Sequence, residues 1–367
     1  MEFKTKHYYI DSGINTSGFG SQKIARIAFY MKVTMSAPGK IALFGEHAVV
    51  WGQPAIVSAI DRRVHVTVEG RTDSMIKISA MDLHVPGVVL TFQEGNKAPV
   101  IETDYGRIVN AVAYVRKAID VCRKHLSLSA DKGANVTIHS EMPVGAGLGT
   151  SAAVSVATLA AYTRLMGHEL RPEELARLGH ITELEVQGAA SPMDTAITTH
   201  GGILYIRPTK PDPYIETVGV PVALPAIIGY TERESSTAEM LRRVKDLRNS
   251  NPRVIDSIMS SIGEVVESAK AALISGDLFT VGKLMNINHG LLESLGVSSK
   301  RLNDMVYSTR FAGAIGSKIT GAGGGGCIIA LCPGKEAEVS TAIRIAGGMP
   351  IQSRLSKTGL KLESLEQ

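Results

Sequence analysis

The sequence predicts a soluble, globular protein in which strands and helices are distributed over two domains. Its 367 residues are enough for two domains of ordinary size, and a hydrophobic content of 44% can furnish more than one core. A stretch at residues 208–213 holds three prolines in six residues and marks a change in composition. We therefore expect a first domain over residues 31–208 and a second domain over residues 209–367.

Composition and charge argue against several classes of protein. The net charge of +4 is small for this length and is not gathered into basic runs, so nucleic acid and membrane surfaces are not expected partners. No apolar run reaches the roughly 18 residues that a membrane helix needs. Cys122, Cys327 and Cys332 are too few for a disulfide scaffold and too unevenly spaced for a zinc site, which favours a reduced, cytoplasmic setting.

Residues 1–30 are expected to be an extension outside the folded domains. Within them, residues 11–22 are rich in Gly, Ser, Thr and Asn, a composition typical of loops and disordered segments. The segment also lacks the apolar core of a signal peptide. The first expected strand follows at residues 32–36, so we expect the extension to be dispensable.

The stretch PGKIALFGEHAVV, at residues 38–50, places polar groups around a short apolar strand at residues 41–44. Lys40 follows a Pro-Gly turn, and Glu46 and His47 follow the strand, so all three are expected at the strand's ends. A solvated surface lysine and a hydrogen-bonded core histidine are the ordinary alternatives for these residue types.

Three further elements precede the middle of the first domain. Residues 63–69 alternate cleanly and predict a strand with its three valines on one face. Residues 82–104 carry two prolines and two glycines without a strong period, which predicts a loop or a lid-like excursion. Residues 106–125 then space their apolar side chains as one face of a helix does.

The stretch PVGAGLGTSAA, at residues 143–153, is a glycine-rich loop that leads directly into a helix. Residues 134–139 before it alternate like a strand, and residues 152–166 after it are long and apolar enough for a buried helix. Glycines leave backbone N–H groups accessible, and a helix N-terminus adds free N–H groups and a positive dipole end. This arrangement suits a phosphate group, although a tight turn without a ligand would show the same local pattern.

The glycine loop does not match the two commonest nucleotide-binding patterns. A Walker A loop needs a lysine before its Ser or Thr, and none is present here. The dinucleotide fingerprint fits poorly because the preceding strand carries Pro143 and no acidic residue ends a following strand at the right distance. A positive charge for the phosphates must therefore come from elsewhere, and Lys40 is a candidate.

A helix over residues 172–187 is predicted by Pro in its first turn, two following acidic residues and Gly188 at its end. Glu183 shares a stripe of this helix with small residues, whereas Glu185 lies on the neighbouring stripe. Asp194 is expected in the turn that follows, before a strand at residues 202–207. Solvated acids and an Asx turn or helix cap are the ordinary alternatives.

The second half of the chain begins with a regular run of elements. These are a buried strand at residues 222–230 and helices at residues 237–248, 254–275 and 278–295. His289 lies within the last of these helices and is expected to be structural. Residues 317–327 form a second glycine-rich run before an apolar strand at residues 328–331. Glycines this dense give up side-chain packing, so another group must approach the backbone closely.

Three separated stretches together resemble the GHMP family of small-molecule kinases. They are residues 38–50, the glycine loop at residues 143–153, and KITGAGGGGC at residues 318–327, in the order that the family has. Between the second and the third, Glu183 and the stretch SPMD at residues 191–194 match the family's metal-binding Glu and the Ser-x-x-Asp that bears its catalytic Asp. The resemblance covers the chain after residues 1–30.

Within the family, the sequence is similar to the members that phosphorylate mevalonate. EHAVV at residues 46–50 departs from the Glu-His-Thr-Asp of galactokinases, and NINHGLL at residues 286–292 resembles another signature of the mevalonate-phosphorylating members. Two positions depart from the usual pattern, since Pro192 stands where the family often has Gly, and Thr150 stands where Ser is common. Both changes keep either the turn or a hydroxyl group.

The resemblance implies the α+β, two-domain fold of the GHMP kinases, with the active site in a cleft between the domains. The implied reaction moves the γ-phosphoryl group of ATP to the 5-hydroxyl of mevalonate, as in isoprenoid synthesis. The implied ATP contacts are Pro143, Gly145, Ala146, Gly147, Leu148, Gly149, Thr150, Ser151 and Ala152. Ser151 and Glu183 are implied to hold Mg²⁺, with Asp194 and Lys40 as catalytic residues. The implied acceptor contacts are Glu46, His47, Thr237 and Gly323.

Other readings of the same motifs remain open. Phosphomevalonate or a sugar would be served equally well by the glycine loops, and a non-catalytic relative would bind nucleotide without turnover. The presence of Lys40, Ser151, Glu183 and Asp194 together favours an enzyme. The resemblance also implies a homodimer, and no residue decides whether prenyl diphosphates inhibit the protein.

Overall fold

The computed structural model describes residues 31–80, 89–91, 100–102, 105–129, 132–143, 145–188, 190–209 and 213–366. The expected extension at residues 1–30 lies outside this part of the chain. Most of the expected loop at residues 82–104 also lies outside it, and the described part forms two short paired strands, β4 (Val89–Thr91) and β5 (Val100–Glu102).

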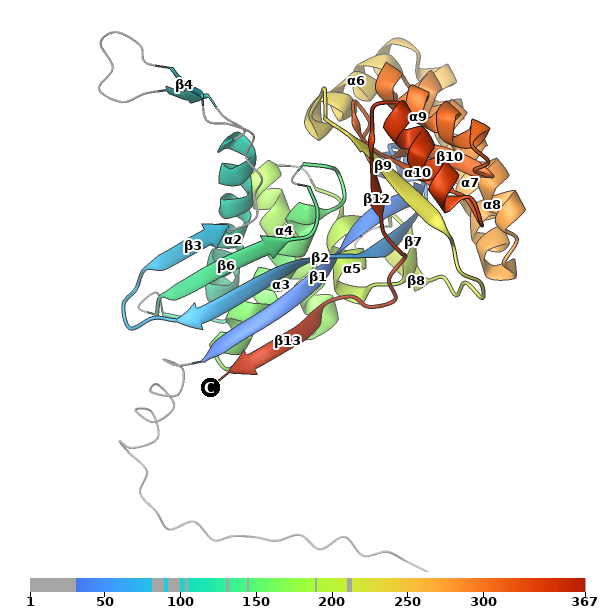
Figure 1. Ribbon diagram of the computed structural model, residues 1–367. Coiled ribbons are helices and arrows are strands. Elements are labelled where there is room, and N and C mark those ends of the chain that lie inside the picture. The colour runs from blue at the N-terminus through green and yellow to red at the C-terminus, as the bar shows by residue number, and fades with distance from the viewer. Residues whose placement is uncertain are drawn as a thin grey trace, which may run out of the picture.

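The larger sheet has the strand order β13-β1-β2-β6-β3, with β7 paired to β2 and β8 paired to β7 (Figure 1). Its strands are β1 (Lys32–Phe44), β2 (Ala55–Gly70), β3 (Ile76–Ala80), β6 (Ala134–Ser140), β7 (Ile203–Arg207), β8 (Tyr214–Thr217) and β13 (Lys361–Glu366). Only β3 and β6 run parallel among the described pairs of this sheet. The expected strand at residues 134–139 is confirmed as β6, and its alternating burial matches one covered face.

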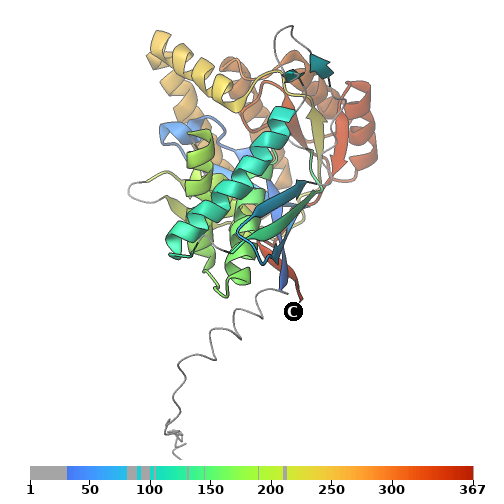
Figure 2. The same cartoon turned by 90° about the vertical axis from the view of Figure 1, so that its left-hand side faces the viewer.

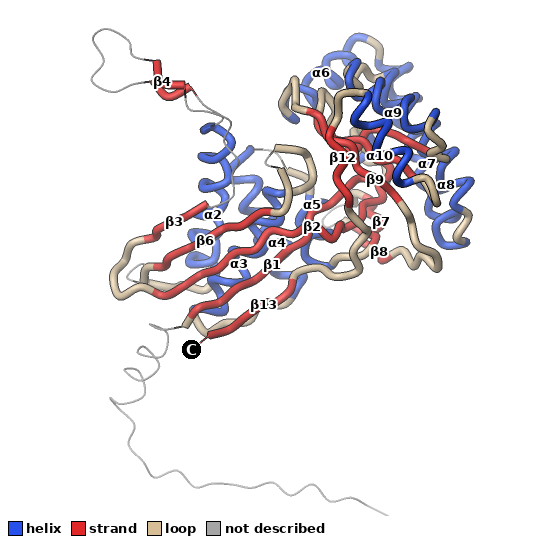
Figure 3. The backbone as a smooth tube through the Cα atoms, in the orientation of Figure 1, coloured by secondary structure: helices blue, strands red, loops and turns tan. Residues whose placement is uncertain are grey.

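One face of the larger sheet is covered by helices, which lie behind the strands in the view of Figure 3. They are α2 (Tyr105–His125), α3 (Thr150–Leu165), α4 (Pro172–Gln187) and α5 (Pro192–His200). Figure 2 shows the same layers from the side. The helix α3 is buried along almost its whole length, as its apolar sequence predicts, because it packs against β1 and β2 with other helices around it.

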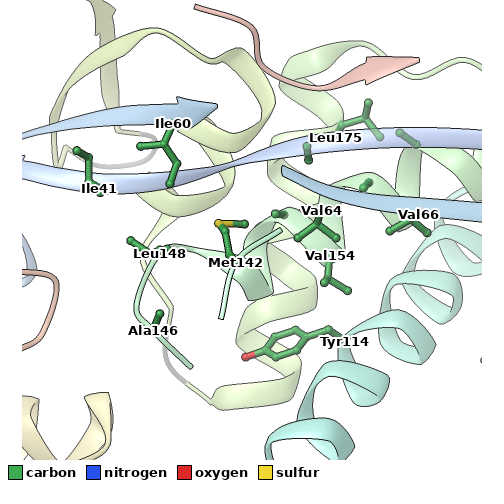
Figure 4. Packing of buried hydrophobic residues seen from close by; sticks show 14 of the residues in the cluster. Ile41, Ile60, Val64, Val66, Tyr114, Met142, Ala146, Leu148, Val154 and Leu175 are labelled. Carbon is green, nitrogen blue, oxygen red and sulfur yellow. The ribbon is translucent and has the colours of Figure 1, made fainter. Parts of the chain in front are cut away.

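The core between the sheet and these helices is built from the alternation in β2. Val64, Val66 and Val68 are fully buried, which confirms the predicted apolar face of that strand. Figure 4 shows Val64 and Val66 on the side of the sheet that faces Val154 of α3. Each fully buried valine contributes about 1.5–3 kcal/mol relative to an exposed one.

The smaller sheet is antiparallel, with the order β10-β11-β9-β12. Its strands are β9 (Ala226–Thr231), β10 (Gly316–Thr320), β11 (Gly326–Leu331) and β12 (Met349–Gln352), and its helices are α6 (Thr237–Ser250), α7 (Pro252–Ser275), α8 (Leu278–Ser294), α9 (Lys300–Phe311) and α10 (Glu336–Ile345). One buried cluster joins residues of the larger sheet to residues of α7, α8 and β11, so both layers share a continuous core.

Two strands on the C-terminal side of residue 208 belong to the larger sheet. The strand β8 pairs with β7, and β13 pairs with β1. Arg63 secures the end of the chain to the sheet, because its Nη2 donates to the carbonyl oxygens of Ser36 (2.9 Å) and Gly359 (2.6 Å). The larger sheet therefore contains strands from both sides of the boundary expected between residues 208 and 209.

The strand β1 differs from the expectation of two strands separated by a Pro-Gly turn. It runs unbroken from Lys32 to Phe44, with an irregularity in its register between Pro38 and Lys40. Lys40 therefore lies in the interior of β1 and not at a strand end. The turn prediction was wrong because β1 keeps its partner β2 on both sides of this point, so the Pro-Gly pair is absorbed as a bulge.

Asp194 also lies in a different element from the one expected. The prediction of a turn at this position was wrong, because Asp194 is in the first turn of α5, whose N-cap is Ser191. The Ser191 hydroxyl accepts a hydrogen bond from the Met193 N–H (3.2 Å). Pro192 at the start of the helix is favourable there, since its missing N–H would have had no helical partner.

The remaining sequence expectations concern cysteines and membranes. Cys122, Cys327 and Cys332 are all free and buried. Among the residues with a described structure, none of the helices combines the length and the apolar character of a membrane span.

Replacing Gly39 by Ala should destabilise the fold by about 1–3 kcal/mol, because a Cβ in this bulge causes overpacking. That atom would lie 2.2 Å from Met142 Sδ and 2.9 Å from the carbonyl oxygen of Leu148. Urea denaturation gives the free energy of unfolding. Gly219→Ala is the matched control, since its Cβ meets no atom within 4 Å. Equal stabilities of the two variants would contradict the close packing of β1 on the glycine loop.

Candidate active site

A pocket of about 420 Å³ lies where β1, the glycine loop and the smaller-sheet layer meet. Its lining includes Lys40, Glu46, His47, Tyr114, Gly145, Gly147, Gly149, Thr150, Ser151, Glu183, Gln187, Ser191, Asp194, Arg233, Thr237, Gly321 and Ala322. These residues come from segments scattered over the chain, and they include residues of all three stretches that carried the family resemblance. The fold thus gathers most of the predicted site residues around one cavity.

The glycine loop turns through three left-handed positions, at Gly145, Gly147 and Gly149, with φ values of 77°, 85° and 75°. A Cβ on Gly149 would lie 2.5 Å from Lys40 Cγ, and a Cβ on Gly147 would lie 2.5 Å from Arg233 Nη2. Glycine is therefore required at these two positions both by the backbone conformation and by the side chains of cations that lie against the loop.

The helix α3 begins at Thr150, two residues earlier than expected, so Thr150 and Ser151 occupy its first turn. The free N–H groups and positive dipole end of this turn face the same pocket as the glycines. Pro143, Ala146, Leu148 and Ala152, also predicted as ATP contacts, do not have side chains in the pocket lining. Any contact from these four would come from their backbone.

Lys40 joins the glycine loop to Asp194. Its backbone N–H donates to the carbonyl oxygen of Leu148 (2.7 Å), and its Nζ lies 2.9 Å from Asp194 Oδ1. The Lys40 side chain is nearly buried, whereas Asp194 is about a quarter exposed. A buried cation next to a phosphate-type loop supplies the charge that the loop itself lacks.

Glu183 and Ser151 form a second polar pair beside the first. The Ser151 hydroxyl donates to Glu183 Oε1 over 2.9 Å, and Glu183 is buried. Glu185 instead faces outward and pairs with Lys117 at 3.1 Å. The stripe argument for α4 thus distinguished correctly the acid that lies in the pocket from the acid on the surface.

The pKa of Glu183 is raised to about 8. Burial is the largest cause, and the negative charge of Asp194 adds to it, while the Ser151 hydroxyl and Lys40 act in the opposite direction. Two acids that repel each other in a buried site favour a bound cation, because a cation would offset both charges.

Glu46 and His47 follow β1 in a tight turn on the other side of Lys40. His47 has a φ of 61°, and its Nε2 is 2.9 Å from the carbonyl oxygen of Ala322. Burial lowers the pKa of His47, so its ring is neutral at pH 7. Glu46 forms a buried ion pair with Lys318 of β10. Both residues line the pocket as expected.

The two remaining predicted acceptor contacts differ in their positions. Thr237 lines the pocket and accepts a hydrogen bond from Arg233 Nη1 (2.9 Å). Gly323 is not part of the lining, and its Cβ position lies 2.0 Å from the carbonyl oxygen of Val297. The neighbours Gly321 and Ala322 face the pocket instead. Gly323 and the three glycines after it are all buried, which the run of glycine letters does not reveal.

Three polar residues of the pocket lining had no role in the sequence analysis. Arg233 follows β9 and lies against the glycine loop, and Tyr114 of α2 accepts a hydrogen bond from Gln187 of α4. Arg233 stands between two glutamates in the sequence, so its local pattern is that of a solvated loop. Tyr114 and Gln187 look like ordinary helix residues, and only helix packing places them in the site.

Comparison with known proteins defines the class. Residues 113–202 match the profile described as the GHMP kinases N terminal domain, and residues 269–347 match that of the GHMP kinases C terminal. The chain belongs to the GHMP kinase family. This confirms the family and the α+β fold predicted from the sequence.

Within the family, the chain is similar to mevalonate kinases. The mevalonate kinase of Thermococcus sibiricus is 47% identical, over 92% of this chain and 100% of that protein. The crystal structure of the Methanococcus jannaschii mevalonate kinase has a TM-score of 0.71 and 29% identity, covering 89% of this chain and 98% of its own. That of L. major mevalonate kinase in complex with R-mevalonate has a TM-score of 0.76 at 24% identity, covering 88% and 96% of the two chains, which supports the fold alone.

Glu183→Gln should change how stability depends on pH in the absence of nucleotide. The pKa of Glu183 is about 8 in the folded protein and about 4.5 when unfolded, so the folded state retains a proton over this range. The group's contribution is therefore present at low pH and is lost as pH rises towards 8, by about 2–5 kcal/mol. Gln cannot ionise, so the variant does not lose this contribution. The stability of the variant relative to wild type should therefore be greater at pH 8.5 than at pH 5.

Thermal unfolding at both pH values measures this effect. Glu185→Gln is the matched control, because Glu185 lies on the same helix, is exposed and pairs with Lys117 at 3.1 Å. Its unfolding temperature should follow that of wild type at both pH values. A similar pH response of the two variants would contradict the burial and repulsion assigned to Glu183.

Proposed function

We propose that the protein is an ATP-dependent kinase that transfers the γ-phosphoryl group of ATP to the 5-hydroxyl of mevalonate, giving 5-phosphomevalonate and ADP for isoprenoid synthesis. The observation that carries the proposal is the Lys40–Asp194 pair, at 2.9 Å, next to the glycine loop in one pocket. Phosphoryl transfer requires mainly that the reacting groups be aligned and that the charge on the phosphate be offset. The similarity to mevalonate kinases supports this acceptor.

The triphosphate would lie in the bend from Gly145 to Ser151. The three left-handed glycines expose backbone N–H groups there, and the first turn of α3 adds the positive end of its dipole. The Lys40 side chain lies against Gly149, so its ammonium group can stabilise the charge that spreads over the transferred phosphoryl group. This arrangement takes the place of a Walker A lysine.

The residues at this end of the pocket fit a magnesium ion that arrives with the nucleotide. Ser151 Oγ and Glu183 Oε1 are 2.9 Å apart and would hold it. The described residues contain no group of three His, Cys, Asp or Glu that could hold a metal alone. Mg²⁺ commonly uses one or two protein ligands together with phosphate oxygens, and when bound it neutralises phosphate charge.

Asp194 would orient the hydroxyl of the acceptor and take its proton at a carboxylate oxygen. The Lys40 ammonium lies 2.9 Å from Asp194 Oδ1 and fixes the direction of this carboxylate. In a loose transition state the proton leaves late, so alignment contributes more than base strength. Glu46 and His47, on the opposite side of Lys40, would contact the remaining polar groups of the acceptor, with Thr237 as a further contact.

Two rival functions follow from the same site. A phosphomevalonate or sugar acceptor would use the same glycine loop and the same Lys40–Asp194 pair. A non-catalytic nucleotide-binding relative is disfavoured, because it would not need a buried lysine paired with an acid at the acceptor side. A homodimer remains a prediction from the resemblance, and a cytoplasmic location remains a prediction from the cysteine content.

A coupled assay of ADP release with a panel of alcohols should identify the acceptor. Mevalonate should give turnover well above the blank without acceptor, whereas phosphomevalonate, galactose and homoserine should not. Turnover on another alcohol but not on mevalonate would overturn the substrate. Binding of ATP without turnover on any of them would support the non-catalytic rival.

Asp194→Asn should lower kcat by about 10²–10⁴-fold, because the amide can neither take the proton nor pair with Lys40 as an anion. The KM for ATP should change little, since the glycine loop is untouched. Steady-state kinetics measures both constants. Asp304→Asn is the matched control, because Asp304 lies on the surface and pairs only with Lys300. Near-normal turnover of Asp194→Asn would remove this residue from the mechanism.

A further inference from the structure

The ion pair between Glu46 and Lys318 is buried between the two sheets. The exposed fraction is 0% for Lys318 and 4% for Glu46. Lys318 Nζ donates to Glu46 Oε1 and, over 2.6 Å, to the carbonyl oxygen of Ile319. The pair links β10 to the turn after β1 across 272 residues of sequence.

The end of β10 and the turn after it contact β1 and the turn after β1 at two other points. Thr320 Oγ1 accepts from the Ala42 N–H (2.9 Å) and donates to the carbonyl oxygen of the same residue (3.0 Å). The carbonyl oxygen of Ala322 lies 2.9 Å from His47 Nε2. Lys318 and Thr320 share one face of β10, because side chains alternate along a strand. The segment that presents Glu46 and His47 to the pocket is therefore clamped from the smaller sheet.

Stability alone does not account for this ion pair. Taking two charges out of water offsets most of their attraction, and apolar side chains of similar volume serve a fold as well or better. Lys318 is also absent from the pocket lining, so it does not itself face a ligand. Its effect on the pocket must pass through Glu46.

Glu46 has one carboxylate oxygen left for a ligand. Lys318 occupies Oε1, whereas Oε2 has no hydrogen-bond partner among the described residues, although Glu46 lines the pocket. An ionised carboxylate can accept hydrogen bonds at both of its oxygens. A buried carboxylate oxygen without a hydrogen-bond partner is energetically unfavourable. A hydroxyl group of an acceptor would satisfy it.

We infer that Lys318 is a positioning residue for the acceptor: it holds the Glu46 carboxyl group in one orientation, so that the second carboxylate oxygen accepts a hydrogen bond from an acceptor hydroxyl group. The inference rests on the proposed function only in taking the acceptor to be an alcohol. Lys318, which lies outside the pocket lining, would thus affect how the acceptor binds.

The charges around the pair support this assignment. Burial raises the pKa of Glu46, and Lys318 is the main charge that opposes the shift, with Lys40 contributing less. The pKa of His289 is lowered to about 3 by burial and by the nearby charges of Arg310 and Lys318, so His289 adds no positive charge to this region at pH 7. Without Lys318, the pKa of Glu46 would rise further, because the main charge that opposes the effect of burial would be lost.

A double-mutant cycle tests the inference, with kcat and KM measured for mevalonate and for ATP. Lys318→Met and Glu46→Gln should each raise the KM for mevalonate by about tenfold or more and leave the KM for ATP within about twofold. If Lys318 acts through Glu46, the double variant should lie within about twofold of Glu46→Gln, whereas independent effects would multiply to about a hundredfold.

Thr309→Val is the matched control for a merely structural effect. Thr309 is fully buried on α9 and bonds Ser317 Oγ at 2.8 Å, one residue from Lys318, without reaching the pocket. It should lower the unfolding temperature and leave the KM for mevalonate unchanged. An equal rise in that KM for Thr309→Val would overturn the inference, as would a Lys318→Met variant with normal KM.

Folding of the variants does not limit the test. Lys318→Met leaves a buried carboxylate unpaired, so it is the variant at risk, whereas the double variant removes both charges. If, of the two variants that change Lys318, only the double variant folds, its comparison with Glu46→Gln decides, and a further tenfold rise in KM would overturn the inference. Failure of both lysine variants to fold would overturn it too, because Lys318 would then serve the fold. If wild type uses another alcohol, the proposed substrate fails and the same cycle is run with that alcohol.

Discussion

The contact between the backbone of Lys40 and the glycine loop is the constraint on which the rest of the site depends. The Lys40 N–H donates to Leu148 over 2.7 Å, and its side chain fills the space that a Cβ on Gly149 would occupy. The stem of the lysine is thereby fixed along the loop, and its Nζ reaches Asp194 at 2.9 Å. One residue thus connects the groups suited to a phosphate with the acid suited to an alcohol.

The pocket contains buried acidic groups that are unfavourable in the isolated protein and that bound ligands would stabilise. Glu183 carries a pKa raised to about 8, mainly by burial and then by repulsion from Asp194. Glu46 is buried with one oxygen unpaired, and burial raises the pKa of its carboxyl. Such groups lower the stability of the isolated protein, and a cation at Glu183 and a hydroxyl group at Glu46 would relieve them. Groups with strongly shifted pKa values are common at functional sites.

Local patterns predicted those elements whose boundaries are set by neighbouring residues. The helix α4 begins at Pro172 and ends before Gly188, as its first-turn proline and C-terminal glycine predicted, and β6 follows the alternation of its side chains. Local patterns failed at Pro38 and Gly39, where strand pairing on both sides overrode a turn signal, and at Asp194, which lies on a helix. The family resemblance implied that Gly323 contacts the acceptor, although this residue packs against Val297.

The sequence by itself determined which chemical groups are available and in which order they occur. They are a lysine outside the glycine loop, two glycine-rich stretches and, between these stretches, Glu183 on a predicted helix and Asp194 after it. Only the tertiary structure decided that Lys40 lies in the interior of a strand, that Glu46 is held by Lys318, and that Arg233 lies against the glycine loop. The reason is that capping and periodicity act within a few residues, whereas a contact such as Glu46–Lys318 closes 272 residues of chain and is chosen by the packing of both sheets.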